Sequence, residues 1–422
     1  MSRPAKTVEP ARLIDDPDWR RFLGARLISL TGTSVTYIAF PVLVFKLSGS
    51  PLLTSLVAAL EAIPYLMFGL PAGALADRFN RKRVMVAVDG VNAAVLASIP
   101  IASWFGVLTV PHLLVAAFVV PALFVFFDAA DFGALPTLVG RGRIASANSA
   151  LWSTSTIVET VVPLAAAALF AVVSPASLIA VDVLSYVASA LLIRTIVRPL
   201  SDARDLASPL SRSALVADVR EGLAFLWSHV TVRSMTAVGA AQSIAGGAFM
   251  GQMVVWASLD LGIQAGDWRL GALFSSWGIG VLVTSLLVPR LVRRLGAARL
   301  TLLALPASAV LCVLTTLARN WVLGTVAMIF WGAAYMAVVI NAITYRQQVT
   351  PEPLMSRVNT TGRMLSFGLG TPIGALLGGL VAQAAGPRAG MLAGAAVLVI
   401  AIVFAWLSPL RREGANPATV AA

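Results

Sequence analysis

Charged side chains are scarce in this 422-residue sequence: Asp, Glu, Lys and Arg make up only 12% of it, whereas 58% of the residues are hydrophobic. A soluble domain holds about 25% charged residues, and its core could not enclose so much apolar side chain. Cysteine and histidine are scarcer still, with Cys312 inside one apolar stretch and His112 and His229 at the edges of two others. We therefore expect no disulfide, no metal site and no cofactor.

The sequence patterns of three other protein classes are missing. No glycine-rich loop ends in Gly-Lys-Ser or Gly-Lys-Thr, the phosphate cradle of an ATP-driven pump. No nucleophile accompanies a recognisable base, so we do not expect an enzyme. The net charge of +12 does not indicate a nucleic acid partner, because the basic residues lie in short clusters between apolar stretches.

Twelve apolar stretches are each long enough to cross a bilayer, which takes about 20 helical residues. They predict an all-α integral membrane protein with spans at 22–45, 52–76, 84–106, 112–139, 144–171, 176–197, 235–259, 269–289, 299–318, 321–344, 360–385 and 389–408. Basic residues gather in the tails and the even-numbered connections, and the odd-numbered connections hold only Lys46, Arg269, Arg319 and Arg388. Lys and Arg are retained on the cytoplasmic side, so both termini are expected there. The excess of arginine over lysine, together with the many alanines, is typical of a GC-rich bacterial genome, so we expect a bacterial cytoplasmic membrane.

The longest polar interval divides the chain into two halves of six spans, a recurrent design of transporters. The predicted units are a cytoplasmic tail (1–21), an N-terminal six-helix bundle (22–197), a cytoplasmic connection (198–234), a C-terminal six-helix bundle (235–408) and a second tail (409–422). Within the connection, apolar residues at helical spacing predict an amphipathic helix on the inner membrane surface: Leu215, Val219, Leu223 and Leu226.

A basic motif, GALADRFNRKR, follows the second span. In this position it resembles the signature of the major facilitator superfamily, whose members have twelve helices in two halves. The resemblance implies a cytoplasmic gate that holds the halves together, and the alternative is a turn that only sets topology. Four residues would form the gate: Gly73, Asp77, Arg78 and Arg81. The matching connection of the second half has Pro289 in place of the acid, so we expect no equivalent gate there.

Three further stretches extend the resemblance over nearly the whole chain: ALPTLVGRGRIASANSALW, DVLSYVASALLI and RQQVTPEPLMSRVNTTGRMLSFGLGTPIGALLGG. They are similar to the drug and siderophore exporters of the superfamily. The fifth span keeps Pro163 of the antiporter pattern but has Val162 where that pattern has glycine. Import of a nutrient or lipid on the same fold therefore stays open, as does, less favoured, a receptor that does not transport.

Ionisable groups inside spans cost roughly 2.5–3.5 kcal/mol at the membrane centre, so they indicate a function or a buried partner. Four are candidates to carry protons: Glu61, Asp128, Asp131 and Glu159. The alternative is a structural role. One of the two glutamates would be paired permanently, for example with Arg26, and Asp128 and Asp131 would only take part in an ion pair at the cytoplasmic entrance of the cavity. For Asp182 we expect a structural hydrogen bond, and Asp89 is expected to brace the basic loop.

The resemblance places the first and fourth helices of each half around a central cavity. The candidates to line it are polar, aromatic and methionine side chains of those helices: Arg26, Thr33, Tyr37, Gln242, Phe249, Met253, Trp256, Trp331, Tyr335 and Asn341. Such a surface suits a sizeable amphipathic ligand, although ordinary helix packing explains any one of them as well. The sequence thus predicts a monomeric secondary transporter that exports a hydrophobic or amphipathic antibiotic, drug or siderophore in exchange for protons, by alternating access.

Overall fold

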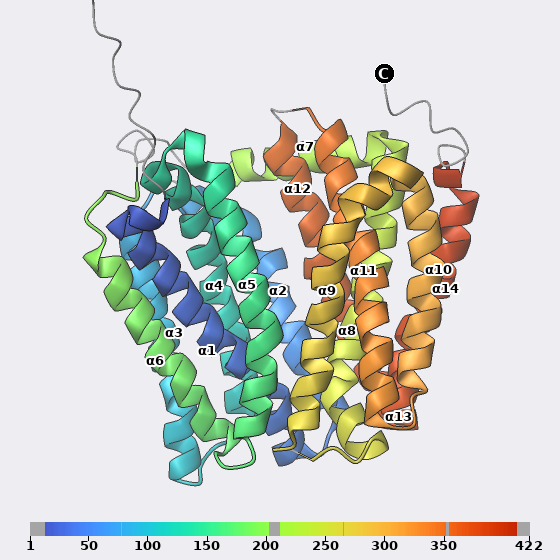
Figure 1. Ribbon diagram of the computed structural model, residues 1–422, viewed down its shortest axis with the longest axis horizontal. Helices are drawn as coiled ribbons and strands as arrows, with labels where there is room; N and C mark the ends of the chain where they lie inside the picture. The colour runs from blue at the N-terminus through green and yellow to red at the C-terminus, as the bar shows by residue number, and fades with distance from the viewer. Residues whose placement is uncertain (1–12, 77, 202–211, 265, 352–353, 412–422) are drawn as a thin grey trace, which may run out of the picture.

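The computed structural model describes residues 13–76, 78–201, 212–264, 266–351 and 354–411, and every regular element in these ranges is helical. Figure 1 shows two helical bundles side by side. The first bundle contains α1 (Pro17–Ser48), α2 (Pro51–Ala76), α3 (Arg81–Trp104), α4 (Val110–Val139), α5 (Ile144–Leu169) and α6 (Pro175–Thr195), with short 3-10 turns η1 (Leu13–Asp15) and η2 (Arg141–Arg143).

The second bundle follows the interval after α6. Helix α7 (Arg212–Ser228) lies in the connection, and the second bundle contains α8 (Val230–Asp260), α9 (Trp268–Leu295), α10 (Ala297–Thr316), α11 (Trp321–Val349), α12 (Met355–Arg363), α13 (Thr371–Ala385) and α14 (Pro387–Leu407). A π-helical segment, η5 (Met364–Gly370), joins α12 to α13, so these three elements make one span. The start of α1 and the end of α14 lie at the same end of the molecule (Figure 1), which we call the termini side. The opposite end is the far side.

Each of the twelve predicted spans falls on one helix, or in the case of 360–385 on α12, η5 and α13 together. Among the described residues, eleven helical segments are long and apolar enough to cross a membrane. The twelfth span is α8, which is long enough at 31 residues but rich in small and polar side chains. It packs against α2, α13 and α14, and most of its residues are buried. Because protein surrounds α8, its surface need not be lipid-like.

Helix α1 shows how local sequence sets the ends of a span. The Asp16 carboxylate accepts hydrogen bonds from the backbone N–H groups of Asp18 and Trp19, which satisfies donors of the first turn. At the other end, Gly49 takes a φ of 60° and donates its N–H to the Phe45 carbonyl. That left-handed conformation favours glycine, so the helix stops there.

The predicted end of the eighth span at residue 289 is six residues too early. Pro289 lies inside α9, which continues to Leu295 and carries Arg293 and Arg294 in its last turn. Gly296, with a φ of 78°, ends the helix instead. Membrane helices tolerate proline in their interior because neighbouring groups satisfy the freed carbonyl, so proline alone is a poor boundary signal here.

The two bundles meet through α2 against α8 and α13, and through α5 against α9. The Gln252 side chain donates to the Pro51 carbonyl at 3.0 Å and also to Ser55, and Ser50 donates to Gln383 at 3.0 Å. Pro51, Ser55 and Gln383 lie at the far-side ends of their helices, Ser50 lies in the turn before α2, and Gln252 lies in the far-side third of α8. Among the residues that the structure describes, no other hydrogen bond joins the bundles. We call these three hydrogen bonds, all on the far side, the far-side seal.

Glycines permit this close approach. A β-carbon on Gly251 would lie 2.7 Å from the Ser55 hydroxyl, and one on Gly271 would lie 2.5 Å from the Pro163 carbonyl oxygen. Both distances are shorter than van der Waals contact. The small-residue pattern of the second half therefore serves contacts between the halves as well as packing inside one half.

The predicted amphipathic helix is present as α7, but part of its apolar stripe packs on protein. Leu226 forms a small buried cluster with Val232 and Val358 of the second bundle, whereas Leu223 stays exposed. Glu221 of α7 forms an ion pair with Arg357 of α12. These contacts fasten α7 to the termini-side end of the second bundle.

The gate motif lies at the termini-side end of α2. Gly73 belongs to α2, Arg78 lies in the turn after it, and Asp77 falls outside the described residues. Arg81 is buried at the start of α3, and its guanidinium packs where a β-carbon of Gly133 in α4 would be. This contact lies within the first bundle.

Candidate substrate and coupling site between the halves

Side chains from both bundles converge midway between them. Tyr37 of α1 lies edge-on to Phe274 of α9, with ring centroids 6.1 Å apart. The Tyr37 hydroxyl is within electrostatic reach of Glu61 on α2, Glu159 on α5 and Tyr335 on α11. We call these five residues the interhalf cluster. Three of its members come from the first bundle and two from the second, so any relative movement of the bundles changes it.

The carboxyl groups of the interhalf cluster pair with no cation that the structure describes. Among the described residues, neither Glu61 nor Glu159 forms an ion pair. Glu61 is half-buried and Glu159 is exposed, and Tyr37 beside them keeps 44% of its surface accessible. Carboxyl groups that are accessible and unpaired at this depth can bind and release a proton, or meet a cationic ligand.

A second group lies nearer the termini side. The Arg363 guanidinium of α12 lies 4.8 Å from the ring centroid of Tyr65 on α2, and Phe367 packs edge-on against the same ring at 5.5 Å. Tyr65 is also within electrostatic reach of Asp128 on α4 and of Arg26 on α1. The facing surfaces of the two bundles thus carry aromatic rings, both signs of charge and hydroxyl groups.

The two aspartates of α4 have different surroundings. Asp131 is buried, and its Oδ1 lies 3.5 Å from the Arg26 Nε. The Arg26 guanidinium in turn lies 5.3 Å from the centroid of Phe127, a cation–π distance. Asp128 is half-buried, one helical turn before Asp131, and forms no ion pair among the described residues. Of the four predicted proton carriers, Asp131 has an arginine partner, and the other three form no ion pair with a described residue.

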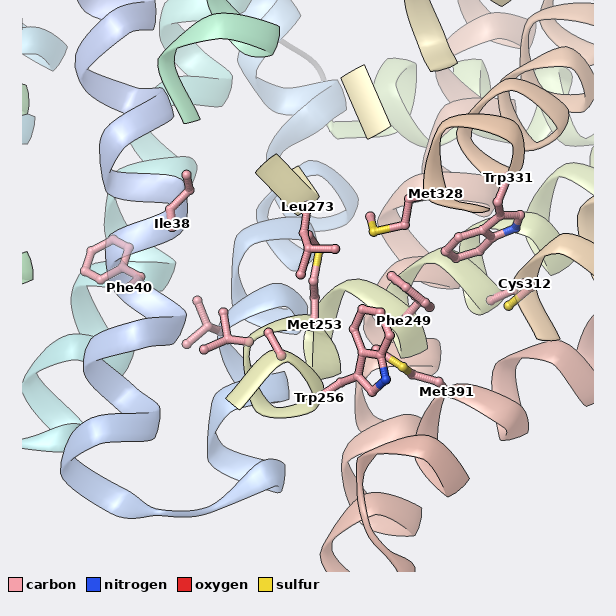
Figure 2. Packing of buried hydrophobic residues seen from close by; sticks show 14 of the residues in the cluster. Ile38, Phe40, Phe249, Met253, Trp256, Leu273, Cys312, Met328, Trp331 and Met391 are labelled. Atoms are coloured by element: carbon pink, nitrogen blue, oxygen red, sulfur yellow. The ribbon is translucent and has the colours of Figure 1, made fainter. Parts of the chain in front are cut away.

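Several predicted cavity residues lie instead in the packed core of the second bundle. Figure 2 shows Phe249, Met253, Trp256 and Trp331 against Met328, Cys312 and Met391. The buried set is fully or almost fully closed to solvent: Gln242, Phe249, Met253, Trp256, Trp331 and Asn341. Two of them join through Ser308 inside the bundle: Trp331 Nε1 donates to Ser308, and Ser308 donates to Gln242, each at 3.2 Å. In this conformation they line no accessible surface.

The remaining predicted cavity residues divide between the interface and the first bundle. Thr33 lies 3.2 Å from the Tyr186 hydroxyl and so faces α6. Tyr335 belongs to the interhalf cluster, and the Trp277 ring joins it to the buried aromatic core, 5.0 Å from Tyr335 and 4.9 Å from Trp331. The exposed part of the aromatic surface is thus supported by rigid packing behind it.

Sequence reasoning missed four residues of this region: Tyr65, Phe274, Trp277 and Arg363. For Tyr65 a signal existed, because it follows Glu61 by four residues and therefore shares its helix face. Phe274 and Trp277 lie on the eighth span, which the resemblance did not place at the cavity. Arg363 is the only charged residue between positions 358 and 387, which could have marked it as an intramembrane cation.

Comparison with known proteins gives relatives of similar length. The chain is 28% identical over 414 residues to the multidrug efflux pump Tap of Mycolicibacterium fortuitum, an alignment that covers 92% of this chain and 95% of the relative. It is 37% identical over 82 residues to Tap of Mycobacterium tuberculosis, covering 19% and 20% of the two chains. It is also 25% identical over 213 residues to macrolide efflux protein A of Streptococcus pyogenes, covering 50% and 52%.

Solved structures share the fold at low sequence identity. The nucleoside transporter NupG superposes with a TM-score of 0.72 at 14% identity, covering 92% of this chain and 96% of the other. A bacterial homologue of the iron transporter ferroportin, solved in an inward-facing state, gives a TM-score of 0.73 at 15% identity, covering 96% and 100%. The fold is that of major facilitator transporters, with twelve membrane-spanning segments in two halves.

A family model described as transmembrane secretion effector matches residues 16–420. The match includes both bundles, the interval between them and every residue of the interhalf cluster. This family and this fold are those of multi-pass membrane transporters, which carry small molecules and are not enzymes. The chain belongs to the transmembrane secretion effector family of the major facilitator superfamily.

Proposed function

We propose that this protein exports amphipathic small molecules, with drugs and antibiotics as the first class to test, and that entry of protons drives the export. It would act as a monomer in a bacterial cytoplasmic membrane, with both termini in the cytoplasm. The relatives named as multidrug and macrolide efflux proteins support the cargo class. The distribution of basic residues supports the orientation.

The observation that carries the proposal is the interhalf cluster. It combines two carboxyl groups that pair with no described cation with accessible aromatic surface from both bundles, at an interface where relative movement of the bundles changes the surroundings of each group. Aromatic surface with a few polar groups suits an amphipathic ligand. Carboxyl groups whose accessibility changes between two conformations can couple proton binding to that change.

In the proposed cycle, the bundles 22–197 and 235–408 rock about this cluster. With the far side sealed by Gln252, Ser55 and Ser50, cargo reaches the cluster from the termini side. Opening of the far side releases cargo and admits protons to Glu61 and Glu159. Protonation removes the negative charge of the two carboxylates. A neutral carboxyl group costs less free energy to move into a less hydrated environment, so protonation favours closure of the far side and reopening of the termini side. Asp128 is the third proposed proton carrier, and Asp131 serves to hold Arg26.

The proposal is tested in energised inside-out vesicles that contain the protein. Their acidic interior is followed with a pH-sensitive dye while macrolides, other antibiotics, cationic dyes and siderophores are added in turn. A transported compound is expected to release protons only when the protein is present. Glu61→Gln removes the proton-binding group and keeps the size of the side chain. We expect this variant to release protons at least tenfold more slowly than the wild type does when a transported compound is added. Asp15→Asn, at an exposed aspartate before α1, is the matched control and should release protons as the wild type does.

The two parts of the proposal fail separately. Undiminished proton release by Glu61→Gln would remove Glu61 from the coupling mechanism but leave export standing. Accumulation of a compound inside intact cells that express the protein would reverse the direction and favour an importer.

A further inference from the structure

A buried polar group lies away from the interhalf cluster, where α3 packs against α6 beside α1. Asp89 and Asn92 of α3 are both 0% exposed and, three residues apart, share one helix face. Ser189 of α6 is also 0% exposed and faces Asp89. Asp89 follows Arg81, the first residue of α3, by eight positions, or about 12 Å along the helix. The group therefore lies inside the span.

Five polar atoms of this group have no hydrogen-bond partner: the oxygens Asp89 Oδ1, Asp89 Oδ2, Asn92 Oδ1 and Ser189 Oγ, and the amide nitrogen Asn92 Nδ2. Buried oxygen atoms in proteins nearly always have a partner, and a carboxyl group in a span needs one most. Bracing of the basic loop, which the sequence suggested for Asp89, is wrong because neither carboxyl oxygen contacts a basic side chain there. An ionised Asp89 carboxylate therefore needs a partner that the described side chains do not supply.

Acidic side chains outnumber basic ones around the group. Arg26 is the cation that acts on Asp89, but its Nε lies 3.5 Å from Asp131 of α4. Asp182, which precedes Ser189 on α6, accepts a hydrogen bond from Thr36 at 2.5 Å and another from a serine, and no described cation pairs with it. One arginine thus stands among three aspartates, which favours binding of a further positive charge.

We propose that Asp89, Asn92 and Ser189 bind a small alkali cation, Na⁺ or Li⁺, between α3 and α6. The donors are all oxygen atoms, which suit hard cations and not the transition metals that take histidine and thiolate. Ca²⁺ takes six to eight oxygen ligands and Mg²⁺ keeps several waters, whereas this buried site offers four unpartnered oxygens. The bound ion joins two helices of the first bundle and makes it a rigid body.

The experiment measures thermal unfolding of the purified protein in detergent at constant pH and ionic strength, with choline chloride replaced by NaCl, LiCl or KCl. Tryptophan fluorescence reports unfolding. We expect the midpoint temperature to rise saturably with Na⁺ and Li⁺ and to change little with K⁺, because a ligand that binds only the folded state stabilises it. Binding of radioactive ²²Na⁺ to the same protein, displaced by unlabelled Na⁺, needs no variant.

Variants then locate the site. Asp89→Asn removes the carboxylate charge and should abolish the rise of the midpoint temperature with Na⁺. Ser189→Ala should keep the fold but need a several-fold higher Na⁺ concentration to reach half of the maximal rise. Asp15→Asn is the matched control and should respond as the wild type does. Glu61→Gln should also keep the full Na⁺ response, since the ion site is separate from the interhalf cluster and its test uses no transport.

Three results overturn the proposal. The first is the same midpoint in Na⁺, K⁺ and choline, with no displaceable ²²Na⁺. The second is a Na⁺ response that Asp89→Asn retains. The third is stabilisation by acid alone in the absence of Na⁺ with no response to Na⁺, which would mean that Asp89 is simply held in its neutral form.

Discussion

The side-chain amide of Gln252 on α8 donates a hydrogen bond to the backbone carbonyl of Pro51, the first residue of α2, at 3.0 Å. Gln252 is fully buried, so water does not compete for this bond. Gln252 also donates to Ser55, one turn into α2. One glutamine thus joins the two halves on the far side, and opening of that side must break both bonds.

Replacing Gln252 with leucine should shift the protein toward a far-side-open conformation. Each lost hydrogen bond is worth about 0.5–1.5 kcal/mol, which corresponds to a roughly two- to twelvefold change in population. The readout is a cysteine at Ala167, a buried residue of α5 against α9, in a protein whose Cys312 is replaced by alanine. Its reaction with a maleimide should quicken in Gln252→Leu and not in Gln264→Leu, at an exposed glutamine. Equal rates in both variants would mean that Gln252 does not hold the seal.

Asn341 should act on stability and not on cargo choice. Its side-chain nitrogen donates to the Ala297 carbonyl and to Thr301, each at 2.7 Å, and it is 1% exposed. Asn341→Leu leaves both acceptors unpaired, at a cost of about 1–3 kcal/mol each. We expect a lower unfolding temperature with an unchanged pattern of preferred compounds in the vesicle assay. A changed pattern at normal stability would place Asn341 in the cargo site.

Two glycines in membrane-spanning helices should respond oppositely to alanine. A β-carbon on Gly374 of α13 would overlap the carbonyl oxygen of Ile244 on α8, whereas one on Gly69 of α2 would meet nothing within 4 Å. Gly374→Ala must push two helices apart, so we expect a loss of about 1–3 kcal/mol. Gly69→Ala should be neutral or stabilise by up to about 1 kcal/mol, since alanine favours helices. Thermal unfolding of both variants in the same detergent measures the difference, and equal losses would contradict the packing described.

Asp267 should stabilise the folded protein at neutral pH but not in acid. The main cause that holds the pKa of Asp267 below its usual value is a hydrogen bond from the Arg269 side chain. The Asp267 carboxylate also caps α9, because it accepts a hydrogen bond from the backbone N–H of Arg269 at 2.9 Å. A lowered folded pKa means that the stabilisation is complete above the unfolded value of about 3.9 and is lost as the pH falls below it. The unfolding temperatures of wild type and Asp267→Asn should therefore differ by a constant amount from pH 5 to 8 and converge below pH 4. A constant difference down to pH 3 would show that the carboxylate charge is not the cause.

The spans were predictable because the thickness of the bilayer fixes the length of an apolar helix, whatever its neighbours are. Even α8, the least apolar, has a helix at the predicted position. The boundary at Pro289 was wrong because a proline stops a helix in water more strictly than it does in a membrane. Local chemistry thus predicted the elements better than their ends.

The positions of the site residues depended on tertiary structure. Helical spacing put Phe249, Met253 and Trp256 on one face of their span, but spacing does not say what that face meets. Since α8 is enclosed on most sides, this face packs into the core. Tyr37, by contrast, lies on a face that meets the other bundle. Sequence alone could not distinguish these two cases.

The burial of α8 has a consequence for how the protein is made. Membrane insertion tests each helix against lipid, and α8 is the span whose small and polar side chains suit lipid least. Its partners α13 and α14 are synthesised after it. Helix α8 must therefore be retained in the membrane before α13 and α14 exist, and the second half reaches its stable form only when the last span has been synthesised. Chains that end early should for this reason be degraded as membrane-exposed intermediates and not persist as half-transporters.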